Sequence, residues 1–182
     1  HFNAGQETFD ASVHGNIVTG HGTWSSDVGV FNGSALFQSA SGLGGYFTIL
    51  PQTALFAHHE LDKVVDLYFT PYSTIRYGVL FGIAFGGTDR VTLRVTSQGA
   101  LYLECTSPGF PYIQTASGVI QQGGRYHIRV AVIGSVWRLC VNGVQIVSVV
   151  ATPWPTSLFS GASIAQLSPP ATGAGLNGSI DE

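Results

Sequence analysis

The stretch that decides the fold is GGRYHIRVAVIGSVWRLCVNGVQIVSVV, residues 123–150. Apolar and polar residues alternate in two runs of this stretch, 126–132 and 137–141. Alternation with a period of two sends successive side chains to opposite faces of a β-strand. One buried face and one partly wet face are typical of an antiparallel sandwich. The residues expected to face the core are Ile128, Val130, Val132, Trp137, Leu139 and Val141.

The segments around this stretch also predict strands. Asn142-Gly143 separates two of them, and Asn-Gly favours a two-residue hairpin turn. Residues 77–85, YGVLFGIAF, lack polar alternation, which predicts a central strand covered on both faces. Shorter strands are expected at 162–166 and 178–181. No apolar pattern at helical spacing lasts long enough to hold a helix, so the sequence predicts an all-β protein.

Charge is scarce in this chain. Only 9% of its 182 residues are Asp, Glu, Lys or Arg, and the net charge is −3; an average soluble domain has about 25% charged residues. Two interpretations remain open: a surface rich in Ser, Thr, Asn, Gln and Gly, or a surface that packs against neighbouring subunits. Because Lys and Arg do not cluster, nucleic acid is excluded as a partner.

Cys105 and Cys140 each lie inside an expected strand and lack metal-type CxxC spacing. Buried thiols are favoured, and a disulfide stays open as the alternative. The most apolar stretch, 77–85, is far shorter than the ~20 residues that span a bilayer, so no membrane insertion is expected. The chain has no Met and begins at His1, which predicts a segment of a longer polypeptide or a processed product.

Four segments, in order along the chain, resemble the concanavalin-A-like (laminin-G-like) domain. Each matches a characteristic strand or hairpin of that family. The resemblance implies a two-sheet antiparallel jelly-roll sandwich, with residues 1–182 forming a single domain. The segments are FDASVHGNIVTGHGTWSSDVGVFNG (9–33), GYFTILP with ELDKVVDLYFTP (45–51 and 60–71), the stretch 123–149, and LNGSIDE (176–182).

The opening, residues 1–33, resembles copies of this domain in bacteriophage virion proteins. That resemblance implies a non-catalytic structural or adhesion module at a virion surface, in a capsid decoration, fibre or baseplate. Its partners would be other virion subunits or further copies of itself, in an oligomer or large assembly, with host-surface glycan as a ligand. The alternative is a carbohydrate-binding module of a secreted, extracellular bacterial protein, which rests on the fold alone.

Catalysis and metal binding find little support in the sequence. Some glucanases of this fold carry carboxylates on one strand, and retaining hydrolysis needs two carboxyl groups about 5–5.5 Å apart. In the comparable run Glu60, Asp62 and Asp66, the last two are separated by ~13 Å along a strand. Adjacent His58 and His59 point to opposite sides of an extended chain. We therefore predict no enzyme activity, no cofactor and no metal site.

Glycan binding is the activity that the fold makes plausible. Sugar sites combine exposed aromatic rings with amide and hydroxyl groups, and Tyr112 and Trp154 are the best candidates because they are expected in Pro-flanked loops. Gln114 and Thr156 would supply hydrogen bonds. In the alternative interpretation these aromatic residues are plugs that close the edge of the sandwich. The full candidate set is Phe110, Tyr112, Trp154 and Trp24.

Overall fold

The structure is a computed structural model of the chain. It describes residues 17–21, 24–27, 34–37, 46–50, 62–71, 78–85, 90–106, 112–153, 159–164 and 178–181. Side-chain surroundings are described within 62–71, 78–84, 90–106 and 112–153 and at Ile180. Every regular element in these ranges is a β-strand, as the sequence predicts. The strands are β1 (Ile17–His21), β2 (Trp24–Asp27), β3 (Ser34–Phe37), β4 (Tyr46–Leu50), β5 (Lys63–Pro71), β6 (Gly78–Phe85), β7 (Arg90–Val95), β8 (Leu101–Cys105), β9 (Tyr112–Gln114), β10 (Tyr126–Ile133), β11 (Val136–Val141), β12 (Val144–Val150), β13 (Phe159–Ile164) and β14 (Gly178–Asp181).

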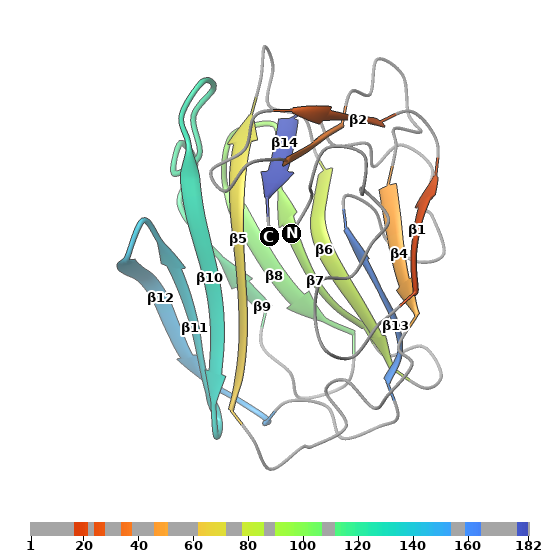
Figure 1. Ribbon diagram of the computed structural model, residues 1–182. Helices are drawn as coiled ribbons and strands as arrows, with labels where there is room; N and C mark the ends of the chain where they lie inside the picture. Colours follow the sequence, from red (N-terminus) through yellow and green to blue (C-terminus); the bar gives the residue numbers. More distant parts are fainter. Residues whose placement is uncertain are drawn as a thin grey trace.

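The strands form two antiparallel sheets of seven strands each. Sheet A has the order β1-β4-β13-β6-β7-β8-β9, and sheet B has the order β12-β11-β10-β5-β14-β3-β2. The two layers face each other in Figure 1, with β12, β11, β10 and β5 at the left and β6, β13, β4 and β1 at the right. Strands that are distant in sequence are neighbours in space, because β13 inserts between β4 and β6 and β14 inserts between β3 and β5. This arrangement confirms the predicted β-sandwich.

The β10–β11 hairpin pairs the predicted core residues, and the β11–β12 hairpin has the predicted turn. Val130 lies opposite Leu139 and Val132 opposite Trp137, so the predicted core residues of the two strands meet on one face. The β11–β12 turn is formed by Asn142 and Gly143, whose φ angles are 51° and 78°. A type I′ turn needs positive φ at both central positions, which Asn-Gly adopts readily. The sequence therefore predicted this turn correctly.

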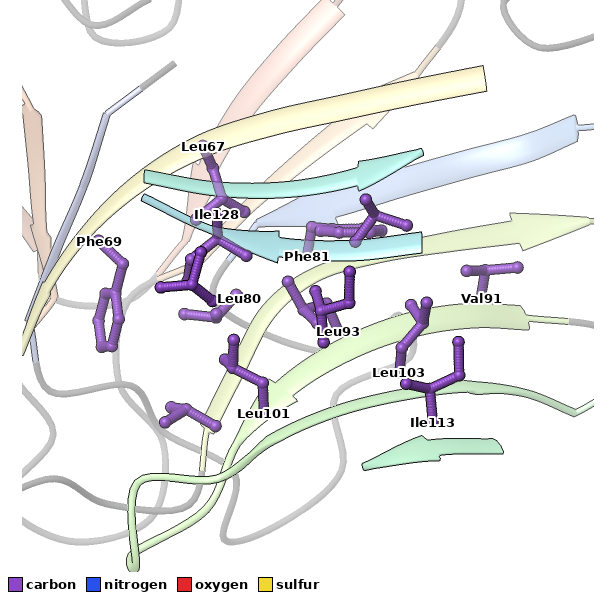
Figure 2. Packing of buried hydrophobic residues seen from close by; sticks show 14 of the residues in the cluster. Leu67, Phe69, Leu80, Phe81, Val91, Leu93, Leu101, Leu103, Ile113 and Ile128 are labelled. Carbon is purple, nitrogen blue, oxygen red and sulfur yellow. The ribbon is translucent and has the colours of Figure 1, made fainter. Parts of the chain in front are cut away.

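The core lies between the inner faces of the two sheets. Sheet A contributes Leu93, Leu101 and Leu103, and sheet B contributes Leu67 and Ile128, all at most 3% exposed. Figure 2 shows these side chains converging between the sheets from β5, β7, β8 and β10. Burial of apolar surface on this scale is the main favourable contribution to folding.

Strand β6 is buried on both faces, as its unbroken apolar sequence predicts. Phe81 and Ile83 lie opposite Leu93 and Val91 of β7 and point into the core. Val79 lies opposite Arg94, on the outer face, and is nevertheless fully buried. The outer face of sheet A is thus closed to solvent at this point.

The two cysteines lie on different sheets. Cys105 ends β8 in sheet A, and Cys140 lies in β11 of sheet B. Both are half-buried, and they form no disulfide with each other. The structure therefore favours thiols over a disulfide, as the sequence does, and the two side chains are less buried than expected.

Trp137 offers a test of which face of β11 is packed in the core. Its side chain is fully buried, and its indole Nε1–H donates to the carbonyl oxygen of Thr152 at 2.8 Å. Trp137→Ala should lower the free energy of unfolding by about 3–5 kcal/mol, measured by urea denaturation. Val64→Ala, at a residue of β5 that is 51% exposed, is the control and should change it by less than about 0.5 kcal/mol. A loss below about 1 kcal/mol for Trp137→Ala would contradict the assignment of this face to the core.

Candidate functional site

The structure corrects the predicted setting of Tyr112. The residue begins strand β9, at the edge of sheet A, and does not lie in a rim loop. Within β9, Tyr112 and Gln114 are exposed while Ile113 between them is 1% exposed, so the strand buries one face only. A proline directly before an edge strand costs no ladder hydrogen bond, which is why Pro111 does not prevent pairing.

The structure does not place the side chains of the other three candidates, Phe110, Trp154 and Trp24, beside Tyr112. Phe110 and Trp154 lie outside the described residues, as does Thr156. The backbone of Trp24 begins β2, at the edge of sheet B, and its side chain is not among those described. Tyr112 is therefore the predicted site residue around which a site can be built.

Tyr112 meets a second tyrosine on the outer face of sheet A. Tyr102 of β8 lies opposite Gln114, and Glu104 lies opposite Tyr112, so the four side chains share one face. The rings of Tyr102 and Tyr112 make an edge-to-face contact, with centroids 4.7 Å apart and planes at 81°. This contact orients the Tyr112 ring, and the residue is still 56% exposed. The result is an aromatic surface that is held in place and open to solvent.

Charged and polar groups lie directly beside the two rings. The Glu104 carboxylate forms an ion pair with the Arg94 guanidinium of β7, and it accepts a hydrogen bond from the Thr92 hydroxyl at 3.2 Å. Thr92 is only 2% exposed, whereas the Glu104 side chain is 24% exposed. Because both partners hold the carboxylate from β7, its position is fixed before any ligand arrives.

An amide completes the group of polar side chains. The Tyr112 hydroxyl donates to Oε1 of Gln114 at 3.5 Å, and Gln114 itself is exposed. We call the five residues of this surface the β8–β9 patch; they are Arg94, Tyr102, Glu104, Tyr112 and Gln114. An exposed ring beside amide, carboxylate and hydroxyl groups suits recognition of a ligand with both C–H and O–H surface. The patch holds one carboxylate, whereas glycoside hydrolysis uses two.

Comparison with known proteins places the fold but not a family. No family model matches the sequence, and no curated protein resembles it in sequence. The binding domain of botulinum neurotoxin DC, solved in complex with rat synaptotagmin II, is similar in structure, with a TM-score of 0.74 and 10% identity over 98% of this chain. The chain spans 45% of the length of that structure.

Two smaller domains also match along most of their own length. Domain 4 of AbnA, a GH43 extracellular arabinanase from Geobacillus stearothermophilus solved with arabinotriose, has a TM-score of 0.59 and 18% identity over 91% of this chain and 80% of its own. The carbohydrate-binding module CBM66 from Bacillus subtilis has a TM-score of 0.51 and 10% identity over 90% of this chain and 89% of its own. At such low identity these similarities show a shared β-sandwich fold.

A second polar cluster lies on the outer face of sheet B. Asp66 of β5 pairs with Arg129 of β10, whose Nε and Nη2 donate to the two carboxylate oxygens at 2.8 and 2.9 Å. Nε2 of His127 lies 2.7 Å from Oδ1 of Asp66, and the His127 ring stacks on Tyr68 with centroids 4.7 Å apart. Sequence reasoning missed this cluster, because its members come from strands that are distant in sequence.

The structure gives separate hydrogen-bond partners to Asp66 and Asp62, two of the three acids in the run that resembles glucanase carboxylates. Both oxygens of Asp66 are engaged by Arg129. Oδ1 of Asp62 instead accepts a hydrogen bond from the Gly134 backbone N–H, in the β10–β11 turn, at 3.2 Å. Glu60, like His58 and His59, lies outside the described residues. In the part of the chain that the structure covers, no three His, Cys, Asp or Glu side chains gather as metal ligands, and no helix is long and apolar enough to cross a membrane.

The Asp66 cluster predicts how stability depends on pH. The hydrogen bond from Arg129 lowers the pKa of Asp66, and burial opposes this effect. The hydrogen bond from His127 lowers the pKa further, by a smaller amount. An unfolded Asp has a pKa of about 3.9. Because the folded value is lower, the cluster stabilises the protein above about pH 4, and that contribution is lost as the pH falls through the folded pKa.

Urea denaturation of the wild type between pH 6 and pH 2 should show this decline, and Asp66→Asn should make it shallower. Arg129→Gln keeps the carboxylate and removes its main partner, so its pH profile should also be shallower. Wild-type steepness in both variants would mean that the cluster does not hold Asp66 in its ionised form.

Proposed function

We propose that the protein is a non-catalytic carbohydrate-binding module and that the β8–β9 patch is its glycan site. The observation that carries the proposal is the Tyr112 ring, 56% exposed and oriented by Tyr102 at an open sheet edge. A sugar's C–H face packs well against such a ring. Exposed aromatic residues are also enriched where proteins bind ligands. The plug interpretation requires a mostly buried ring, which does not describe Tyr112.

The polar members of the patch would select the sugar. Gln114 presents an exposed amide with both donor and acceptor groups. The Glu104 carboxylate, held by Arg94 and Thr92, offers its remaining acceptor capacity to a sugar hydroxyl. Because the carboxylate is already placed, binding need not pay to order it. Two structures that share the fold are described as a carbohydrate-binding module and as an arabinanase domain in complex with arabinotriose, which supports the proposal.

The setting in which the module works is a separate proposal. We favour the extracellular surface, as part of a secreted bacterial protein, because one of the similar structures belongs to an extracellular arabinanase. A phage-type virion surface is the second proposed setting, and it rests on the resemblance of residues 1–33 alone. Antibody detection in cultures of the source distinguishes them. A secreted protein stays in the cleared medium, whereas a virion protein sediments with the particles.

Tyr112 provides the test of the glycan site. An array of bacterial, plant and animal glycans should first identify a bound sugar for the wild-type chain. Tyr112→Ala should then weaken binding at least tenfold, a factor that corresponds to about 1.4 kcal/mol, because the stacking surface is lost. The melting temperature should hardly change, since an exposed ring contributes little to the core. Tyr112→Phe keeps the ring and should bind nearly as well as the wild type.

The control for surface substitution is Ile133→Ala, at an exposed residue of sheet B that is 42% exposed. It should leave glycan binding unchanged. An array that stays blank for the wild type, or a Tyr112→Ala variant that binds like the wild type, would contradict the proposed site.

A further inference from the structure

Strand β12 is an exposed sheet edge with little of the usual protection. It ends sheet B, and no described strand pairs with its outer side. Its sequence, VQIVSVV, contains no charged residue and no proline. Val144 is 62% exposed, Ile146 39% and Val150 76%. Natural proteins protect such edges with Lys, Pro, very short strands or bulges, because an open edge pairs readily with another strand.

The corresponding edge of sheet A shows the contrast. Strand β9 has three residues and follows Pro111 directly, so it offers little to pair with. Strand β12 carries one protective device, a β-bulge where the partners of Leu139 and Cys140 change from Val147 to Gln145. The bulge interrupts the ladder at Ile146, and the segment from Val147 to Val150 runs in regular register.

We infer that β12 pairs antiparallel with β12 of a second copy of this chain, with the two-fold axis at Ser148. Directly opposite residues of an antiparallel pair share one face of the sheet. An axis at Ser148 therefore sets Val147 against the partner's Val149, and these two residues share a face because they lie opposite Leu139 and Trp137 of β11. An axis at Val147 instead sets Val144 against Val150, which lie on opposite faces because Val144 pairs with Val141 and Val150 pairs with Val136.

Charge favours the same occupant. An uncharged strand meets no like charge when it pairs with its own copy. On the outer face of sheet B, Arg138 of β11 lies opposite Ser148, one strand in from the edge. Two such arginines would be separated by three strand spacings, about 14 Å, which exceeds the Debye length of about 10 Å at 0.1 M salt. Charged residues make up 9% of this chain, so two copies repel each other little. Pairing with a second copy would also cover the exposed valines of β12.

The pairing has a consequence for the proposed glycan site, and this consequence rests on the proposed function. Strand β9 lies beside β12, at the same side of the sandwich. A two-fold axis between antiparallel strands is perpendicular to the sheet and keeps corresponding faces on one side. The two β8–β9 patches of the dimer would therefore face the same way, and a dimer would hold a surface polysaccharide at two points, which raises retention without any new contact.

The experiment measures the oligomeric state of the 182-residue chain by sedimentation velocity over a range of concentrations. The wild type should show a monomer–dimer equilibrium. Ser148→Lys puts two ammonium groups opposite each other at the axis and should shift the chain to monomer, and Ser148→Glu should do the same. An equimolar mixture of the two variants should dimerise again, because only this register sets Lys against Glu.

Val64→Lys is the control, since Val64 is 51% exposed on β5, away from the edge. It should dimerise like the wild type. Melting temperatures of all variants confirm that they fold. A wild type that stays monomeric, a dimer that Ser148→Lys leaves intact, or a mixture that fails to dimerise would each overturn the inference. None of these readouts involves sugar, so failure of the glycan site is detected separately, as loss of binding to a monovalent glycan by a chain that still dimerises.

Discussion

The structure depends on which residues of the β10–β11 hairpin face the core. Three cross-strand pairs, Ile128 with Val141, Val130 with Leu139 and Val132 with Trp137, put six apolar side chains on one face, none more than 6% exposed. A slip of one residue between the two strands would turn the three core side chains of one strand outward and bring a charged neighbour, Arg129 in β10 or Arg138 in β11, into the core. Strand β5 takes its register from β10, and β14 takes its register from β5. The correct pairing of two strands thus aligns the sheet against which sheet A closes.

The same alternation sends every second side chain to the outer face of its sheet, and the outer side chains of the two sheets differ in how they are engaged. On sheet B the outward carboxylate of Asp66 is satisfied by Arg129 and His127, so its hydrogen-bonding capacity is largely used within the protein. On sheet A the inward turn of Leu101 and Leu103 sends Tyr102 and Glu104 outward, where the neighbouring strand adds an exposed ring. A ligand therefore finds more unused surface on β8 and β9 than on the charged cluster. This difference, more than the fold, locates the candidate site.

Local sequence signals predicted the local features and could not predict the pairings between distant strands. Asn142-Gly143 fixed its own turn, and the apolar run of β6 revealed its own burial. The contacts of Asp66 with His127 and Arg129 join residues 61 and 63 positions apart, and nothing within either strand indicates its partner. Tyr112 was expected in a loop because prolines flank it, and its strand of three residues is too short for alternation to be recognised.

The outer positions of β8 and β9 carry more information about function than the core does. Structures at 10–18% identity share this sandwich, so the fold tolerates nearly complete change of sequence. The side chains at positions 102, 104, 112 and 114 face away from the core, and the Tyr112 ring, which is 56% exposed, gains little burial there. Two tyrosines that meet edge to face there, beside a carboxylate fixed from the next strand, are therefore not explained by folding. The proposed recognition of a glycan would account for them, since a rigid ring with polar neighbours binds without an ordering cost.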